Sequence, residues 1–304
     1  MILELEDIAD SFGTSIYDFD DEFISLYNSH NWSYNVATGA DRDKLIIEVL
    51  EFLKQDVQKT GDNNRITRWE NGWRENLEAY KRTRDVKNII PKFIRPKQPI
   101  RLKGEFVFTE DPNFELNYVR LIQKWIFHKY MGDCTSIHEF GCGSGINISF
   151  LSEIFPQKKL FGYDFVQSSI DIINMLSDTN PNIKGFIFDM TRPSSISVDD
   201  NSCVFTFCSI EQLSNSFRNF INFVLESNPK LCVHIEPIVE LYNPTSIIDY
   251  TAICFHKQRD YVSGLLPYLQ DLCRNNKIEL TKVHRMQFGS LRSEGYMQLI
   301  WRPK

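Results

Sequence analysis

Alternating glycines led by a carboxylate form the part of this chain best suited to chemistry. The sequence HEFGCGSG places Gly141, Gly143 and Gly145 directly after a short apolar run, and Glu139 precedes them. Glycine is required in such a turn because the backbone takes positive φ and because a Cβ would hold a ligand away from the main chain. A second apolar run ends on Asp164, where a carboxylate can accept hydrogen bonds from both hydroxyls of a ribose. The spacing predicts a nucleotide-binding β-α-β unit.

The glycine spacing also indicates which nucleotide is bound. A dinucleotide fingerprint has a third glycine three residues after the second, at the position that Ile146 occupies, so the pattern disagrees with a pyrophosphate ligand. A leading carboxylate would repel a pyrophosphate and attract an ammonium group. The form Glu139-Phe-Gly-Cys-Gly-Ser-Gly145 resembles motif I, E/D-x-G-x-G-x-G, of class I S-adenosylmethionine-dependent methyltransferases. The ligand of that motif is a zwitterionic methionine on a sulfonium.

The resemblance covers roughly residues 115–304 and implies a cofactor site. The family carries an adenine-binding carboxylate after its third strand, where Asp189-Met190 stands, and lines the sulfonium after its fourth strand, where Cys208-Ser209 stands. The implied cofactor is S-adenosyl-L-methionine, with S-adenosyl-L-homocysteine as product. Its implied contacts are Glu139, Gly141, Cys142, Gly143, Gly145, Asp164, Phe165, Asp189, Met190, Cys208 and Ser209.

The fold that the resemblance implies is an α/β, Rossmann-like seven-stranded sheet, mostly parallel with an antiparallel last strand, flanked by helices and preceded by a helical extension. Apolar runs predict strands of this sheet. They are expected at 159–163, 184–188, 203–208, 230–235, 278–286 and 296–301. An amphipathic helix is expected at 261–273.

The chain divides into an extension with a basic arm, residues 1–112, and a methyltransferase domain, residues 113–304. Within the extension, residues 41–59 have the apolar period of a helix. Asn71-Gly72 is a turn signal between two tryptophans.

Candidate catalytic residues follow from the reaction. Methyl transfer from a sulfonium is an in-line displacement, so the protein chiefly aligns donor and acceptor, and a base assists when the acceptor is a hydroxyl. Ligands of such sheets bind at the carboxyl ends of the strands, which makes Glu211 and Glu236 candidates. Residues 245–261 are polar and aromatic, and we expect a loop that faces the acceptor, with His256 as the first choice of base. A capping role for this histidine stays open.

The acceptor is expected to be a small molecule, such as a sugar, a nucleotide-linked sugar or a natural-product intermediate. Its candidate contacts are Trp69, Trp73, Tyr250, Arg259 and Tyr261. Between residues 81 and 103 the chain has nine Lys or Arg against one acid, and we expect this arm to present Arg95, Lys97 and Arg101 to an anionic acceptor. A solvated connector is the alternative for the arm, as a small helical core is for the tryptophans.

Charge, hydropathy and cysteine content disfavour several other classes of protein. The net charge of −6 disfavours a nucleic-acid partner, and no apolar run is as long as a membrane span. Seven cysteines without a C-x-x-C pair predict free thiols in a reducing compartment and no metal site. The N-terminus lacks the features of a signal peptide, so the expected location is cytoplasmic. A homodimer, a catalytically silent cofactor-binding partner protein and an NAD(P)-dependent oxidoreductase stay open as alternatives.

Overall fold

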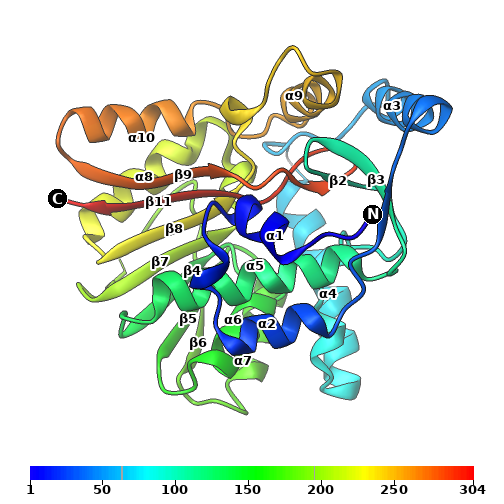
Figure 1. The fold of residues 1–304 in the computed structure, drawn as a ribbon. Helices are drawn as coiled ribbons and strands as arrows, with labels where there is room; N and C mark the ends of the chain where they lie inside the picture. The colour runs from blue at the N-terminus through cyan, green and yellow to red at the C-terminus, as the bar shows by residue number, and fades with distance from the viewer. Residues whose placement is uncertain (63, 195) are drawn as a thin grey trace.

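The computed structural model describes residues 1–62, 64–194 and 196–304, and within them the chain builds a seven-stranded sheet (Figure 1). The strand order is β6-β5-β4-β7-β8-β11-β9. The strands are β4 (Ser136–Phe140), β5 (Lys159–Asp164), β6 (Ile183–Ile187), β7 (Ser202–Phe207), β8 (Leu231–Glu236), β9 (Ile278–Arg285) and β11 (Met297–Pro303). The first five in spatial order are parallel, and β11 is antiparallel to both β8 and β9. This arrangement confirms the Rossmann-like sheet with an antiparallel last strand.

Helices cover both faces of this sheet because its strands are apolar on both sides. One face packs on α5 (Phe114–Met131), α6 (Ile146–Ile154) and α7 (Gln167–Leu176), and the other on α8 (Phe217–Ser227) and α10 (Leu265–Arg274). In the central strand β7, Cys203 and Phe205 belong to the first core and Val204 to the second. Alternate side chains of one strand therefore build two cores, as the period of two requires.

The N-terminal extension contains strands as well as helices. Its helices are α1 (Leu5–Phe12), α2 (Asp21–Asn28), α3 (Gly39–Leu53) and α4 (Arg65–Thr83). Its strands β1 (Tyr34–Val36), β2 (Ile100–Leu102) and β3 (Glu105–Thr109) form a second sheet, ordered β1-β3-β2-β10, with β10 (Phe288–Ser290) from near the C-terminus. The extension therefore contains the expected helices and, in addition, strands that the sequence did not predict. Strands of three residues carry too little periodicity to be recognised in a sequence.

A helix stands where the acceptor-facing loop was expected. Helix α9 (Ile247–Arg259) fills most of residues 245–261 and lies beside α3 (Figure 1). Its buried face mixes apolar and polar side chains, which are Ile248, Asp249, Thr251, Ala252, Phe255 and His256. The pattern was missed for this reason. Helix α10 begins at Leu265, four residues later than expected, because Gly264 takes φ +86° at its N-terminal end.

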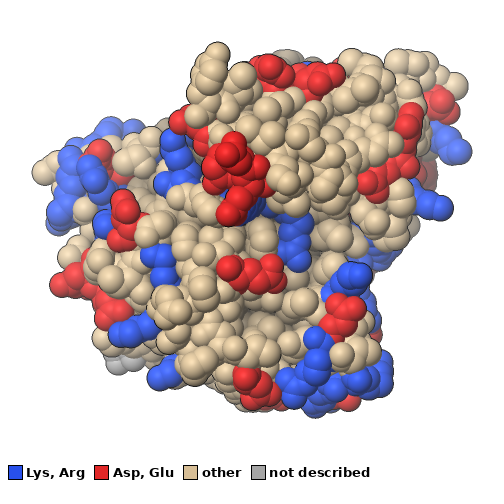
Figure 2. Space-filling view, turned by 60° about the horizontal axis from the view of Figure 1, so that its bottom comes forward, with Lys and Arg blue, Asp and Glu red and all other residues tan. Residues whose placement is uncertain are grey.

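Short 3-10 helices complete the described secondary structure. They span Ile16–Asp18, Val86–Ile89, Ile210–Ser216 and Val239–Leu241. None of the helices in the described ranges is both long enough and apolar enough to cross a membrane. On the face shown in Figure 2, basic and acidic side chains are interspersed.

Helix α4 runs without interruption through Asn71-Gly72, so the expected turn there was wrong. The ion pair between Arg74 and Glu70, with 2.8 Å between Nη2 and Oε1, spans this dipeptide along the helix surface. An i,i+4 pair supports the helix at this point, although exposure keeps its contribution small. The helix predicted at 41–59 is present but ends at Leu53.

A glycine-to-alanine substitution at residue 72 tests the continuity of α4. Gly72 is exposed, and a Cβ there would meet nothing within 4 Å. We expect Gly72→Ala to raise the free energy of unfolding by about 0.5–1 kcal/mol, since alanine is the better helix former. Gly104, equally open but at φ +80°, is the matched control, and Gly104→Ala should lower stability. Chemical denaturation measures both, and a destabilised Gly72→Ala would contradict a continuous helix.

Candidate active site

The glycine turn after β4 has the backbone that the sequence predicted. Gly141, Gly143 and Gly145 have φ values of +73°, +52° and +75°. The Gly141 and Cys142 N–H groups donate to the Tyr163 carbonyl at 2.8 and 3.0 Å, which fastens the turn to the end of β5. A Cβ at Gly141 would lie 2.4 Å from the Ser209 Cβ. The turn thus needs glycine for its conformation and for its close approach to the segment after β7.

Asp164 is buried at the end of β5 and is connected to the glycine turn. Its Oδ2 accepts the Gly143 N–H at 2.9 Å, and its Oδ1 accepts the Val166 N–H at 3.2 Å. Burial raises the pKa of this carboxyl to about 6. Each carboxylate oxygen has a second lone pair, so both can accept one further hydrogen bond. Asp164 can therefore hold the turn and still bind a pair of hydroxyl groups.

Glu139 has one carboxyl oxygen that is satisfied and one that is not. Its Oε1 accepts from Asn147 Nδ2 at 2.6 Å, whereas Oε2 is buried without a hydrogen-bond partner among the described residues. Burial raises the pKa of Glu139 to about 8. A buried oxygen without a donor is costly, and a bound ammonium group would supply the donor. The residue types and the unpaired oxygen fit the zwitterionic part of the expected cofactor.

Helix α4 lies across this edge of the sheet. A Cβ at Gly143 would lie 2.8 Å from Trp73 Cζ2, so the indole packs on the glycine turn. The Arg65 guanidinium lies 4.1 Å from the Phe165 ring centroid, and its Nη1 is 3.9 Å from Asp189 Oδ1. Trp73 was expected at the acceptor, but the structure places it on the turn.

Two further expected cofactor contacts lie near the same edge. Met190 is buried, and its Cε would be 3.2 Å from a Cβ at Gly141. Asp189 is partly exposed and accepts the Thr191 N–H at 2.9 Å. The structure thus brings together the glycine turn, Asp164, Phe165, Asp189 and Met190, which the sequence suggested as one site.

Glu236, a candidate catalytic residue, is fully buried and binds the backbone after β7. Its Oε1 accepts the Ser209 N–H at 3.0 Å, and its Oε2 accepts the Glu211 N–H at 3.3 Å. The Ser209 hydroxyl in turn donates to the Phe140 carbonyl at 2.9 Å. Burial raises the pKa of Glu236 to about 7. Because both oxygens accept backbone N–H groups, Glu236 holds this segment in place against the end of β4.

A cavity of about 580 Å³ opens beside the segment after β7. Cys208, Glu211 and Gln212 of that segment contribute to its wall, together with Tyr296 and the N-terminal turn of α5. The wall also contains residues that were expected to contact the acceptor. These are Trp69, Arg95, Lys97, Arg259 and Tyr261. A second cavity of about 340 Å³ lies between α2 and α5, among charged residues remote from the glycine turn.

The carboxyl groups of Glu48, Glu115 and Glu211 line the larger cavity. Burial, reinforced by the neighbouring Glu236, raises the pKa of Glu211 to about 8, and its Oε1 accepts from Gln212 Nε2 at 2.8 Å. Glu115 is 6% exposed, accepts a hydrogen bond from Gln98, and has a pKa raised by burial to about 7. The sequence did not single out Glu115, because an acid in the first turn of a helix is ordinary there. Carboxyl groups with such pKa values suit general-base catalysis near neutral pH.

His256 lies outside the wall of this cavity. It is 2% exposed within α9, and its ring packs edge-on against Tyr242 and Tyr261, with centroids 5.7 and 5.4 Å apart. Burial lowers its pKa to about 4, and neither ring nitrogen has a hydrogen-bond partner among the described residues. Tyr250, on the same helix, is 51% exposed and is also absent from the cavity wall. His256 therefore contacts the candidate Tyr261 without lining the cavity, and Tyr250 does not line it either.

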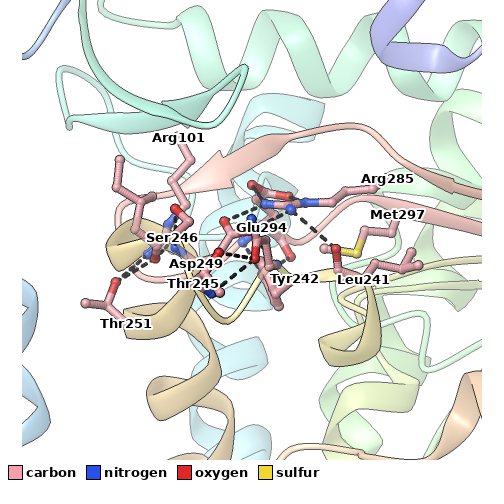
Figure 3. Close-up of polar contacts among 12 residues, drawn as sticks. Arg101, Leu241, Tyr242, Thr245, Ser246, Asp249, Thr251, Arg285, Glu294 and Met297 are labelled. Atoms are coloured by element: carbon pink, nitrogen blue, oxygen red, sulfur yellow. Dashed lines mark hydrogen bonds and ion pairs between the residues drawn. The ribbon is translucent and has the colours of Figure 1, made fainter.

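Arg101 is 0% exposed, so its expected role in presenting charge to an acceptor was wrong. Its Nη1 donates to the Ile248 carbonyl at 2.7 Å, and its Nε donates to the Leu291 carbonyl at 3.0 Å. Figure 3 shows it beside a second buried cluster, in which Arg285 binds both Asp249 and Glu294. These contacts connect β2, α9 and the segment after β10. Arg101 thus fixes the wall of the cavity without facing it.

Within the described residues, no group of three or more His, Cys, Asp or Glu side chains is placed to hold a metal ion. The described cysteines are all free.

No protein-family model and no curated protein matches this sequence. Solved structures do match at the level of the fold. The N-methyltransferase NodS from Bradyrhizobium japonicum WM9, in complex with S-adenosyl-L-homocysteine, is 14% identical; the match covers 75% of this chain and 98% of NodS, with a TM-score of 0.49.

Two further matches are more distant. Geranyl diphosphate C-methyltransferase from Streptomyces coelicolor A3(2) is 9% identical over 64% of this chain and 85% of its own, with a TM-score of 0.46. Human N-acetylserotonin methyltransferase, in complex with S-adenosylmethionine, is 8% identical over 85% of this chain and 66% of its own, with a TM-score of 0.44. At these identities and scores the likenesses say nothing about the acceptor or the atom modified.

Proposed function

We propose that this chain is an S-adenosylmethionine-dependent methyltransferase that acts on a small molecule. The observation that carries the proposal is the unpaired, buried Oε2 of Glu139 beside a three-glycine turn that is hydrogen-bonded to Asp164. An ammonium group near Glu139 and a ribose near Asp164 would satisfy the two carboxylates at once. A dinucleotide would place a pyrophosphate near Glu139, and a pyrophosphate has no N–H or O–H group to donate to the unpaired Oε2. An NAD(P)-dependent oxidoreductase is therefore the weaker alternative.

The proposed cofactor site uses the residues that the fold brings to one edge. Glu139 and the glycine turn hold the methionine part, Asp164 and Phe165 the ribose, and Asp189 with Met190 the adenine. Cys208 and Ser209 lie beside the sulfonium. When bound, S-adenosylmethionine supplies an electrophilic methyl group and leaves as the neutral thioether S-adenosylhomocysteine.

Two side chains of α4 lie where the cofactor is proposed to bind. The Trp73 indole lies on Gly143, and the Arg65 guanidinium lies on the ring of Phe165. Both positions belong to the proposed site, so cofactor binding requires these side chains to turn away or α4 to shift.

The acceptor is proposed to bind in the cavity beside Cys208. A hydroxyl is the favoured acceptor, on a sugar, a nucleotide-linked sugar or a natural-product intermediate, and transfer to nitrogen or carbon is the alternative. The acceptor oxygen forms its bond to the methyl carbon as the carbon–sulfur bond breaks. Glu211, whose Oε2 makes no hydrogen bond among the described residues, takes the proton that the oxygen loses. Glu211 replaces His256 as the proposed base because it lines the cavity and His256 does not.

Calorimetric titration with S-adenosylhomocysteine tests the cofactor assignment, with NADH as the control. We expect micromolar affinity for S-adenosylhomocysteine and no binding of NADH, because Glu139 opposes a pyrophosphate. Binding of NADH alone would reject the proposal in favour of an oxidoreductase.

A catalytically silent, cofactor-binding partner protein makes a different prediction. It would bind S-adenosylhomocysteine with the same affinity but would transfer no label from methyl-labelled donor to any acceptor in a panel of hydroxylated small molecules. Transfer to one member of the panel decides for an enzyme.

A further inference from the structure

Three arginines from distant parts of the sequence line one cavity. Arg95 comes from the segment between α4 and β2, Arg259 from the end of α9, and Arg292 from the segment between β10 and β11. Glu211 and Cys208, at the proposed reaction centre, belong to the same cavity wall. The fold thus gathers positive charge beside the place where the acceptor is proposed to react.

Contacts with a backbone carbonyl and with aromatic rings fix the positions of two of these arginines. Arg259 Nη1 donates to the Gln58 carbonyl at 2.6 Å, and its guanidinium lies 5.4 Å from the Tyr261 ring centroid. The Arg292 guanidinium lies 3.6 Å from the ring centroid of Phe52. Aromatic contacts of this kind leave the edge N–H groups of a guanidinium free to bind a ligand.

Hydrogen bonds also fix the backbone near Arg292 and Arg95. Arg101 Nη2 donates to the Arg292 carbonyl at 3.3 Å, and its Nε binds the preceding carbonyl. Two residues after Arg95, the Lys97 N–H donates to the Pro112 carbonyl at 2.9 Å. The buried Arg101 therefore supports the segment that carries an exposed cation. Such preorganisation lowers the entropy lost when a ligand is bound.

No carboxylate neutralises this group within ion-pair distance. Among the described residues, Arg95, Lys97, Arg259 and Arg292 form no salt bridge, although fifteen such contacts occur elsewhere. Burial, followed by the charge of Arg95, lowers the pKa of Arg292, and Arg259 acts in the same direction. Like charges held together cost free energy unless an anion accompanies them.

The acids that face the cavity do not cancel this charge. They are Glu48, Glu115 and Glu211. Burial raises the pKa of Glu115 to about 7 and that of Glu211 to about 8, so both carry only part of a negative charge near neutral pH. The four cations Arg95, Lys97, Arg259 and Arg292 therefore outnumber the acids on this wall.

We propose that Arg95, Arg259 and Arg292 bind an oxyanion of the acceptor, so that the substrate class is a small molecule bearing a phosphate or a carboxylate. The inference rests on the proposed function, because the anion is taken to be part of the methyl acceptor. Guanidinium groups bind such oxyanions through two parallel N–H···O bonds. Anchoring the anion here positions the rest of the molecule toward Glu211.

Direct titration with simple anions tests the site without knowledge of the acceptor. The full chain, saturated with S-adenosylhomocysteine, is titrated at low ionic strength with inorganic phosphate and, separately, with malonate. The anion that binds more tightly indicates whether the acceptor carries a phosphate or a carboxylate. We expect Arg95→Gln and Arg292→Gln each to weaken binding of that anion by about ten- to a hundredfold.

Arg302→Gln is the matched control, since Arg302 is exposed and paired with Glu279 away from the cavity. It should leave anion affinity within about twofold, because distant exposed charges are screened. Failure of the wild-type chain to bind either anion, or equal weakening by Arg302→Gln, overturns the proposal. Unchanged affinity of the cavity variants for S-adenosylhomocysteine shows that they are folded.

The result also separates this inference from the proposed function. Anion binding that depends on Arg95 and Arg292, in a chain that binds no S-adenosylhomocysteine, would keep the anion site and reject the methyltransferase. The anion titration is therefore also carried out in the absence of S-adenosylhomocysteine. Affinity for S-adenosylhomocysteine with no effect of the arginine variants would reject the anion site alone.

Discussion

Replacing Glu211 with glutamine should lower turnover by about a hundred- to ten-thousandfold, the usual contribution of a general base. The amide keeps the size of the side chain but cannot accept the proton that the acceptor loses. Affinity for S-adenosylhomocysteine should stay within about twofold, because the proposed cofactor contacts lie elsewhere. Single-turnover transfer from labelled donor and calorimetry measure the two effects, and a fully active Glu211→Gln variant would remove Glu211 as the base.

The pH dependence of turnover provides an independent test of the same residue. Glu211 acts as a base only when ionised, and its pKa is raised to about 8 by burial and by Glu236. Wild-type turnover should therefore rise with pH and level off above about 8, whereas Glu211→Gln should show no such rise. His256→Asn is the comparison, since the pKa of His256 is lowered to about 4 and its ring lies outside the cavity wall. Loss of the rise in His256→Asn alone would restore the histidine as the base.

Replacing Asp164 with alanine should weaken binding of S-adenosylhomocysteine by about 1–3 kcal/mol, or roughly five- to 150-fold. The variant loses the proposed acceptor of the ribose hydroxyls. It also releases the Gly143 and Val166 N–H groups, so the turn becomes less well ordered. Asp178→Ala is the control, because Asp178 is an exposed carboxylate that pairs with Arg84. Calorimetry measures both, and an affinity within twofold of the wild type would reject the ribose assignment.

The elements that were predicted have a clear apolar pattern, and those that were missed do not. The central strands β7 and β8 are largely apolar and buried, and such parallel strands are recognised by composition. Helix α9 buries the polar Asp249, Thr251 and His256 among its apolar side chains. This mixture hides the period, so residues 245–261 were taken for a loop. Helix α4 passes through Asn71-Gly72 because packing and helical context outweigh a local turn signal.

The glycine turn and its acids were predictable from local sequence, since Gly141, Gly143, Gly145 and Asp164 act through backbone conformation and position at strand ends. These requirements are local, and residues within one β-α-β unit meet them. The acceptor cavity, by contrast, forms only when distant segments fold together. Glu115, Arg292 and the other lining residues come from segments more than a hundred residues apart, and no local pattern records their convergence. The buried Arg101 illustrates the reason: its charge suggested a surface arm, whereas carbonyl groups from distant segments satisfy it inside the fold.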